Sequence, residues 1–288
     1  MSKFFTDTDC ELWYTDVDKY DMNIIEMPYT LDGEEQFYDM GRKTDFKKLF
    51  DRMREGAIPS TSALNPQSYV DYFEPHFKNG DDVLYVHFSD QLSGTFEYMK
   101  TAYAELKEKY PERELKTFNT KNISLGGGFI ALEAAKMHKA GKSDEEIIEF
   151  LEEFTPKVNM VFVVDSLSHL KRGGRISGAS AVIGSMLNIK PILKITNEGK
   201  IEKCATAKGM KKAINVIVDE MTTKIEKREE YPVIVMNADN KELADYAEKV
   251  IKEKLGEDVR VEHYPIGPVI GAHCGPGTVG LVYYGGTR

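Results

Sequence analysis

Paired cysteines, long apolar runs and an excess of positive charge are all missing from this sequence of 288 residues. Its three cysteines, Cys10, Cys204 and Cys274, stand far apart, which argues against a disulfide framework and against a cysteine-based metal site. Such cysteine usage is typical of a reducing compartment. No apolar run is long enough to cross a bilayer, and the first residues lack the pattern of a signal peptide. We therefore expect a cytoplasmic protein without stable membrane insertion.

The charge balance and the glycine pattern exclude further classes. A formal net charge of -9 argues against non-specific binding of nucleic acid or of an anionic membrane surface. The one glycine run, Leu125-Gly-Gly-Gly128, lacks the terminal Gly-Lys-Ser/Thr of a phosphate-binding Walker loop, so a tight strand–helix junction is the simpler interpretation. We expect no cofactor and no metal.

Segments with strand and helix patterns alternate along the whole chain. An apolar strand at 83–88 precedes an amphipathic helix at 96–110, and a second strongly apolar strand follows at 158–164. Pro156 and Lys157 separate the two halves. This alternation predicts an α/β fold with two α/β domains, residues 1–156 and 157–288, and largely parallel sheets.

Hydroxyl groups, glycines and one histidine follow several of the predicted strands. Ligands of open α/β sheets bind outside the carboxyl ends of the strands, where such residues would gather. Few lysines or arginines accompany them, which favours a single carboxylate over a nucleotide triphosphate as the ligand. The segments are Asp7-Thr8, Ser60-Thr61-Ser62, Ser89 to Thr95, and Gly271 to Gly277.

The turn after strand 83–88 is the best defined of these segments. A helix opens at Ser93-Gly94-Thr95, and the unpaired N–H groups of a helix N-terminus suit an anion. Gly94 allows a ligand to approach the backbone closely. Ser93 could equally be a simple helix cap, and the turn alone does not decide between the two roles.

His273 lies in a Gly/Pro-rich segment that is expected to be a loop between two strands. A structural and a functional role are equally compatible with that position. Ser93 and His273 could form a nucleophile and base, which would make the protein a serine hydrolase or acyltransferase. The sequence lacks a nucleophile elbow and an acid placed to orient the histidine, so this alternative is the weaker one.

A cationic turn stands out on this acidic chain. Lys171, Arg172 and Arg175 flank two glycines. This segment could be a solvent-exposed loop without a specific role, or it could be a docking surface for a partner or a phosphate.

Five motifs together resemble the DegV family of bacterial fatty-acid-binding proteins, in order and spacing over essentially the whole chain. Each motif alone is weak, whereas five in register are specific. They are Thr61-Ser62, Leu92-Ser-Gly-Thr95, Lys171-Arg-Gly-Gly-Arg-Ile-Ser177, Leu187-Asn-Ile-Lys-Pro-Ile-Leu193 and Gly267 to Gly277.

The resemblance implies a lipid-binding protein, not an enzyme by itself, that holds a long-chain fatty acid such as palmitate between two α/β domains. Some family members are the lipid-carrying subunit of a fatty acid kinase, in which a separate ATP-binding subunit phosphorylates the acid. A lipid-responsive regulatory sensor is the other alternative. Matching residues are Thr61, Ser93, Gly94 and His273 for the carboxylate, Met186, Leu187, Ile189 and Ile192 for the acyl tunnel, and Arg172 and Arg175 for docking of the kinase subunit.

Three positions depart from the family pattern. Thr8 and Asn119 stand where Ser and Asp are usual, and Lys208 stands where Arg is frequent. Lys208 keeps the charge but loses the planar fork of a guanidinium. These departures leave the use of a kinase partner open.

Overall fold

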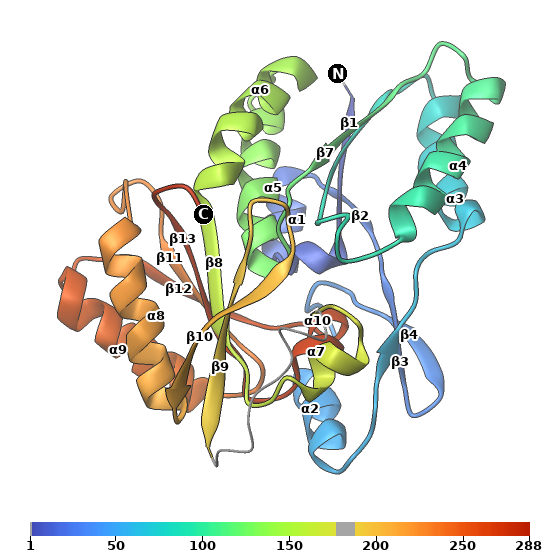
Figure 1. Ribbon diagram of the computed structural model, residues 1–288. Coiled ribbons are helices and arrows are strands. Elements are labelled where there is room, and N and C mark those ends of the chain that lie inside the picture. The colour runs from blue at the N-terminus through green and yellow to red at the C-terminus, as the bar shows by residue number, and fades with distance from the viewer. Residues whose placement is uncertain (1, 177–187) are drawn as a thin grey trace.

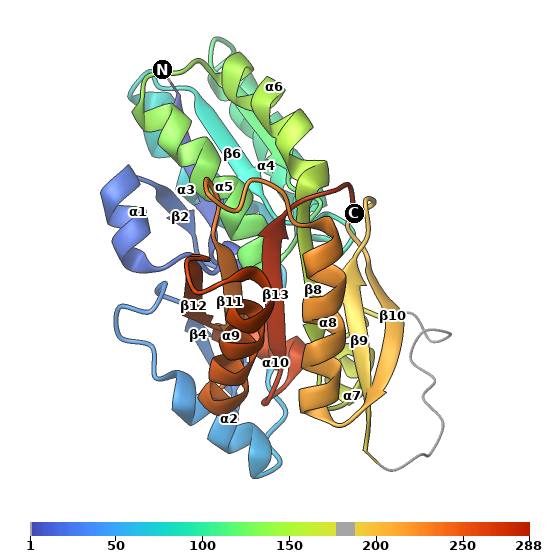
Figure 2. The ribbon, with the colours of Figure 1, turned by 90° about the vertical axis from the view of Figure 1, so that its left-hand side faces the viewer.

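Two central β-sheets, one in each half of the chain, organise the computed structural model, which describes residues 2–176 and 188–288 (Figures 1 and 2). The first sheet is entirely parallel, with strand order β2-β1-β6-β7. Its strands are β1 (Lys3–Asp7), β2 (Asn23–Ile25), β6 (Val83–His87) and β7 (Leu115–Asn119).

Helices cover both faces of this parallel sheet. α3 (Pro66–Lys78) and α4 (Thr95–Lys109) pack together on one face, and α5 (Ser124–Lys139) lies with its neighbours on the other (Figure 1). The neighbours of α5 are α1 (Tyr14–Tyr20) and α6 (Asp144–Phe154). Asn65 caps α3 ahead of Pro66, and Ser143 with Glu146 forms a capping box for α6, as the sequence predicts.

The second sheet has six strands in the order β10-β9-β8-β13-β11-β12 and is mostly antiparallel. The expectation of largely parallel sheets is therefore correct for the first half and wrong for the second, where β11 and β12 are the one parallel pair among the described strands. The strands are β8 (Val158–Val163), β9 (Ile189–Ile195), β10 (Ile201–Lys208), β11 (Val233–Asn237), β12 (Val261–Pro265) and β13 (Val279–Tyr284). The α/β class and the two-domain organisation are confirmed.

The two faces of the six-stranded sheet bury different cores. α8 (Met210–Lys224) and α9 (Lys241–Leu255) cover the outer face, where Val161 and Val163 of β8 pack (Figure 2). Met160 and Phe162 alternate with them along the strand and face the core shared with the N-terminal half. This period of two leaves one apolar sheet face directed at the junction between the halves.

Part of the N-terminal half packs on the C-terminal half. β3 (Pro28–Leu31), β4 (Glu34–Phe37) and β5 (Ser60–Thr61) form a small antiparallel sheet, which is joined by α2 (Phe46–Arg54). Asp32-Gly33, a dipeptide that favours a tight hairpin turn, connects β3 to β4. Both α2 and this sheet contact α10 (Pro268–Cys274). The short 3-10 helix η2 (Thr155–Lys157) precedes β8, and a boundary between residues 156 and 157 stays a prediction.

Three short helical segments occur where the sequence predicts loops or turns. The expected loop at 265–277 contains α10, which begins at Pro268 after an extended Gly267. This is a favoured helix start, so the expectation of a loop around His273 is wrong. The cationic turn likewise contains α7 (Ser168–Arg172), and η1 (Thr8–Cys10) follows β1. Residues 179–187 are small and apolar, a composition that favours a buried helix, and they lie outside the described residues. No helix in 2–176 or 188–288 is both long and apolar enough to cross a membrane.

Candidate ligand-binding site

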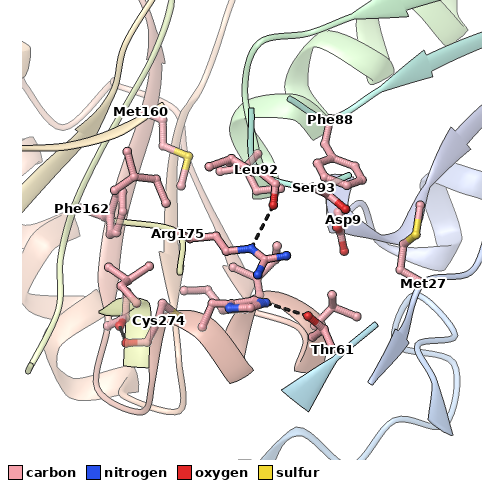
Figure 3. A pocket seen from close by; sticks show the side chains of 18 of the residues that line it. Asp9, Met27, Thr61, Phe88, Leu92, Ser93, Met160, Phe162, Arg175 and Cys274 are labelled. Carbon is pink, nitrogen blue, oxygen red and sulfur yellow. Dashed lines mark hydrogen bonds between the residues drawn. The ribbon is translucent and has the colours of Figure 1, made fainter. Parts of the chain in front are cut away.

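A cavity lies between the two halves of the molecule, with an empty volume of about 900 Å³ that includes open solvent at its mouth. The N-terminal half contributes mainly loops that follow strands, and the C-terminal half contributes the inner face of its sheet together with α7 and α10 (Figure 3). The cavity has a cluster of polar groups and a larger apolar remainder. The polar groups belong to Asp9, Thr61, Ser62, Ser93, Arg175, His273 and Thr278.

Thr61 and His273 meet across the junction of the two halves. The Thr61 hydroxyl Oγ1 lies 2.8 Å from Nε2 of His273. Thr61 is held on β5 by its pairing with Tyr29 of β3, and His273 stands in the last turn of α10. Two residues 212 positions apart in the sequence thus form one hydrogen-bonded pair at the cavity wall.

His273 is electrically neutral near neutral pH. Burial, and secondarily the positive charge of Arg175, lowers the pKa of the imidazole to about 4. Its second nitrogen, Nδ1, is buried without a partner. A Cβ atom at Gly173 would lie 2.2 Å from Nδ1, so only a glycine allows this approach of the cationic turn to the ring. The histidine can therefore offer a hydrogen bond but no charge to a ligand.

Ser93 and Gly94 lie in the turn between β6 and α4, half-buried and exposed respectively. The Ser93 hydroxyl accepts a hydrogen bond of 3.3 Å from the backbone N–H of Thr95, at the start of α4. Gly94 is the N-cap residue of α4, so Ser93 is not the cap itself, but its hydroxyl pairs with the first N–H of the helix and its side chain lines the cavity. The Thr95 hydroxyl points elsewhere, to the buried Tyr69 at 2.8 Å.

Arg175 connects the cationic turn to the Ser93 turn. Its Nε donates a hydrogen bond of 2.9 Å to the carbonyl of Leu92, and the side chain lines the cavity (Figure 3). Arg172, by contrast, is exposed at the end of α7. The two residues predicted for docking therefore occupy different environments, one in the cavity wall and one on the surface.

The apolar wall of the cavity comes mainly from the six-stranded sheet of the C-terminal half. Met160 and Phe162 of β8 and Met236 of β11 supply the inner sheet face, and Ile201 of β10 extends it. The hairpin that carries Ile201 is fixed to the N-terminal half, since the Ser89 hydroxyl donates a hydrogen bond of 2.8 Å to the carbonyl of Gly199. A Cβ atom at Gly199 would lie 2.2 Å from that hydroxyl, and its φ of 86° also favours glycine.

The residues predicted for an acyl tunnel do not line this cavity where they are described. Ile192 packs on the outer face of the sheet, in the core beneath α8 and α9. Ile189 is half-buried at the start of β9. Met186 and Leu187 lie outside the described residues. The apolar residues that do line the cavity were missed because alternation alone does not reveal which sheet face meets the other half of the chain.

Asp9 is a cavity residue that sequence reasoning missed. It lies in η1, directly after β1, and lines the cavity beside the Ser93 turn (Figure 3). The signal was present, because Asp9 follows the Asp7-Thr8 strand end that the sequence did single out. Asp7 itself is turned away from the ligand side and accepts hydrogen bonds from Tyr85 and the backbone of Phe88.

The three positions that depart from the family pattern have structural partners or lie apart from the cavity. The Thr8 hydroxyl accepts a hydrogen bond of 2.9 Å from the backbone of Met27, and the Asn119 side chain accepts one of 2.8 Å from Lys121 N–H. Lys208 is exposed at the end of β10. None of the three lines the cavity.

The arrangement suits binding better than hydrolysis. Within the described residues no hydrogen bond joins Ser93 to His273, and Nε2 of the histidine is directed at Thr61. No carboxylate orients the ring, because Nδ1 is unpaired. In residues 2–176 and 188–288 no group of three His, Cys, Asp or Glu side chains is placed to hold a metal ion.

The chain is similar to DegV proteins over nearly its whole length. A DegV domain-containing protein of Clostridium perfringens is 38% identical over 291 aligned positions, which cover 100% of this chain and 99% of the relative. A DegV family protein of Thermus thermophilus, whose structure is described by its fatty acid binding, is 29% identical with a TM-score of 0.85, covering 98% and 99% of the two chains. DegV of Bacillus subtilis, described as a fatty acid binding protein, is 29% identical with a TM-score of 0.80 and 98% coverage of both chains.

A family model gives the same assignment. The model described as "Uncharacterised protein, DegV family" matches residues 2–285, which is nearly the full length of the sequence. The resemblance in the five sequence motifs is thereby confirmed, and the chain belongs to the DegV family.

Proposed function

We propose that this protein binds one long-chain fatty acid in the cavity between its two halves. The acyl chain lies against the apolar wall of the C-terminal sheet, and the carboxylate is held by Thr61, Ser93, Gly94 and His273. The single observation that carries this proposal is the cavity itself, in which hydroxyls and a neutral histidine from separate strand ends and helices meet at one otherwise apolar site. The fatty acid binding described for the Thermus thermophilus and Bacillus subtilis relatives supports it.

The acyl chain supplies most of the binding free energy. Removing a sixteen-carbon chain from water is worth about 12 kcal/mol in gross terms, at ~0.8 kcal/mol per methylene. Association and ordering of the chain cost several kcal/mol of this. A tail of this length therefore binds strongly wherever an apolar cavity admits it, and the head group determines its orientation.

The carboxylate requires hydrogen bonds, because an unpaired buried charge is prohibitively unfavourable. Each hydrogen bond to a charged group contributes about 1.5–3 kcal/mol. The Thr61 and Ser93 hydroxyls and the Gly94 amide at the start of α4 form a sufficient set. They also fix the orientation of the carboxylate, which a phosphoryl-transfer reaction needs.

The proposal extends to presentation of the carboxylate to a separate ATP-binding kinase subunit. The protein itself then supplies no catalytic group, in keeping with the geometry of Ser93 and His273. Arg172 is the exposed cation of the cationic turn and stands close in sequence to Arg175 in the cavity wall. A partner that docks on Arg172 would therefore come near the mouth of the site.

Native mass spectrometry of the purified protein tests the proposal. We expect a mass increase that corresponds to one fatty acid, and release of that acid on extraction into organic solvent. Protein stripped of lipid should rebind palmitate or oleate with a stoichiometry of one. A protein that carries no lipid and also fails to bind either acid would contradict the proposed function.

A further inference from the structure

Asp9 is a buried carboxyl group with an oxygen that has no partner in the protein. The residue is only 6% exposed, and its Oδ1 atom makes no hydrogen bond. Its backbone is fixed by the bond from Asp9 N–H to the Asp7 carboxylate, at 3.1 Å. The side chain lines the cavity on the side of Ser93 (Figure 3). A buried polar atom without a partner is costly, so an open oxygen at a cavity wall indicates a ligand group that completes it.

The surroundings of Asp9 determine its charge. Desolvation, followed by the negative charges of Asp7 and Glu11, raises the pKa of Asp9 well above its ordinary value. The positive charge of Arg175, across the cavity, opposes this effect. Burial also keeps the nearby Tyr69 and Tyr85 phenols protonated.

His273 lines the same cavity as Asp9. It is neutral near neutral pH, because burial lowers the pKa of its imidazole to about 4. Among the described residues that line the cavity, Arg175 is the one cation that can compensate negative charge there. It balances one anion, whereas an ionised Asp9 beside a fatty-acid carboxylate would make two. Two carboxylates that share one site cannot both remain ionised, because each strongly raises the pKa of the other.

We propose that Asp9 binds the fatty-acid head group as a neutral carboxylic acid, so that Asp9 and the bound carboxylate share a single proton. This inference rests on the proposed function. The O–H group donates a hydrogen bond to a carboxylate oxygen of the ligand, which provides the partner that Oδ1 lacks. When the free protein has an ionised Asp9, the proton comes from solvent, and binding of one fatty-acid anion takes up one proton. The negative charge of the pair is then balanced by Arg175.

The inference makes Asp9 a specificity-determining residue. A site in which Asp9 is neutral accepts the ionised acid, or a head group of similar size and charge that has an acceptor oxygen. A ligand with a doubly charged head, such as an acyl phosphate, adds a second negative charge and is held less well. The acid is therefore retained in preference to its phosphorylated product at the same site.

Proton counting by titration calorimetry tests this inference with the intact protein. Delipidated wild type and Asp9→Asn are titrated with palmitate between pH 6.5 and 9, in two buffers of different ionisation enthalpy. Asparagine imitates the neutral acid in size and offers an N–H donor. Glu26→Gln is the matched control, because Glu26 is a partly buried carboxyl group that does not line the cavity. 1-Hexadecanol serves as a ligand with the same tail and no charge.

Wherever Asp9 is ionised in the free protein, wild type and Glu26→Gln should take up one more proton per bound palmitate than Asp9→Asn, and their affinity should fall by about tenfold per pH unit. Asp9→Asn should bind palmitate without proton uptake and with a flat pH profile. Equal proton uptake by wild type and Asp9→Asn would overturn the role of Asp9. If Asp9→Asn does not fold, equal proton counts for palmitate and 1-hexadecanol in wild type would overturn it. Failure of wild type to bind palmitate at any pH would instead refute the proposed function.

Discussion

The two halves of the molecule both have an α/β fold, but one contributes a polar wall to the cavity and the other an apolar wall. The N-terminal sheet is parallel and meets the cavity with the loops that follow its strands, which carry Asp9 after β1 and Ser93 after β6. The C-terminal sheet is mostly antiparallel and meets the cavity with one face, which carries Met160, Phe162 and Met236. Parallel strand ends concentrate polar groups, whereas a sheet face presents every second side chain of an apolar strand. The difference explains how one cavity can be polar at one place and apolar over the rest.

The largest effect is expected from a charge on the apolar wall. Ile201→Glu should lower palmitate affinity by about 100-fold or more. The carboxylate of the introduced glutamate would lose its hydration when the acyl chain packs against it, which is unfavourable. Native mass spectrometry should find no retained fatty acid. Thr206→Glu, at an exposed position of the same strand, is the control and should retain lipid like wild type. Equal lipid content in the two variants would show that β10 does not form the tail wall.

Removal of the hydroxyls should weaken binding next. Thr61→Ala and Ser93→Ala should each lower affinity for palmitate by about 10- to 100-fold, through loss of a hydrogen bond to a charged group. A fluorescent fatty-acid displacement assay measures this, with Ser60→Ala as the control for loss of an exposed neighbouring hydroxyl. If the affinity for 1-hexadecanol falls as much as the affinity for palmitate, the two hydroxyls do not bind a carboxylate.

The polar edge of the N-terminal half should also make folding depend on pH. Burial raises the pKa of Asp7 to about 7 and that of Glu11 to about 8, so the folded state holds protons that the unfolded state has lost. Their stabilising effect is complete at low pH and disappears as pH rises through these values. His87 and His273, with pKa values of about 4, act in the opposite direction but only below about pH 6.5.

Between pH 6.5 and 8.5 the free energy of unfolding should therefore fall by ~2 kcal/mol. Urea denaturation at the two pH values measures the change. Glu11→Gln preserves the acceptor oxygen that faces Gly267 N–H and should show a clearly smaller fall than wild type. An unchanged pH dependence in this variant would assign the effect to other groups.

The smallest effect on lipid binding is expected at the exposed cation of the cationic turn. Arg172→Ala should leave palmitate affinity within about twofold of wild type, because the side chain does not line the cavity. With the ATP-binding subunit of a fatty acid kinase present, formation of acyl phosphate should fall. Arg175→Ala should reduce acyl phosphate as well, but it also removes the bond to the Leu92 carbonyl. Unchanged turnover by Arg172→Ala would remove the docking role from this residue.

The sequence predicts those features of the fold that local patterns determine. The N-terminal strand–helix order, the capping box at Ser143 and the hairpin at Asp32-Gly33 follow from caps, turns and periodicity, and they agree with the structure. Strand direction in the second half does not follow, because hydrophobic alternation is the same for parallel and antiparallel pairs. The helix around His273 was missed although Gly267-Pro268 is a helix start, since the glycines after it indicate a loop.

The candidate site divides in the same way. Thr61, Ser93, Gly94 and His273 are brought to one cavity wall, although a spacing of up to 212 residues gives no local sign of contact. The position of their segments after predicted strands grouped them, and the five-motif resemblance assigned them to one carboxylate. Their role in binding a carboxylate stays a prediction. The apolar wall depends on which sheet face meets the other half, and the open oxygen of Asp9 depends on tertiary burial. Neither property can be predicted from the residues next to these positions in the sequence.

A crystal structure of the protein with palmitate tests the central claim most directly. The account predicts an elongated ligand between the halves, with its carboxylate within hydrogen-bond distance of the Thr61 and Ser93 hydroxyls and its tail along Met160 and Phe162. A palmitate bound in the reverse orientation, or bound outside this cavity, would contradict it.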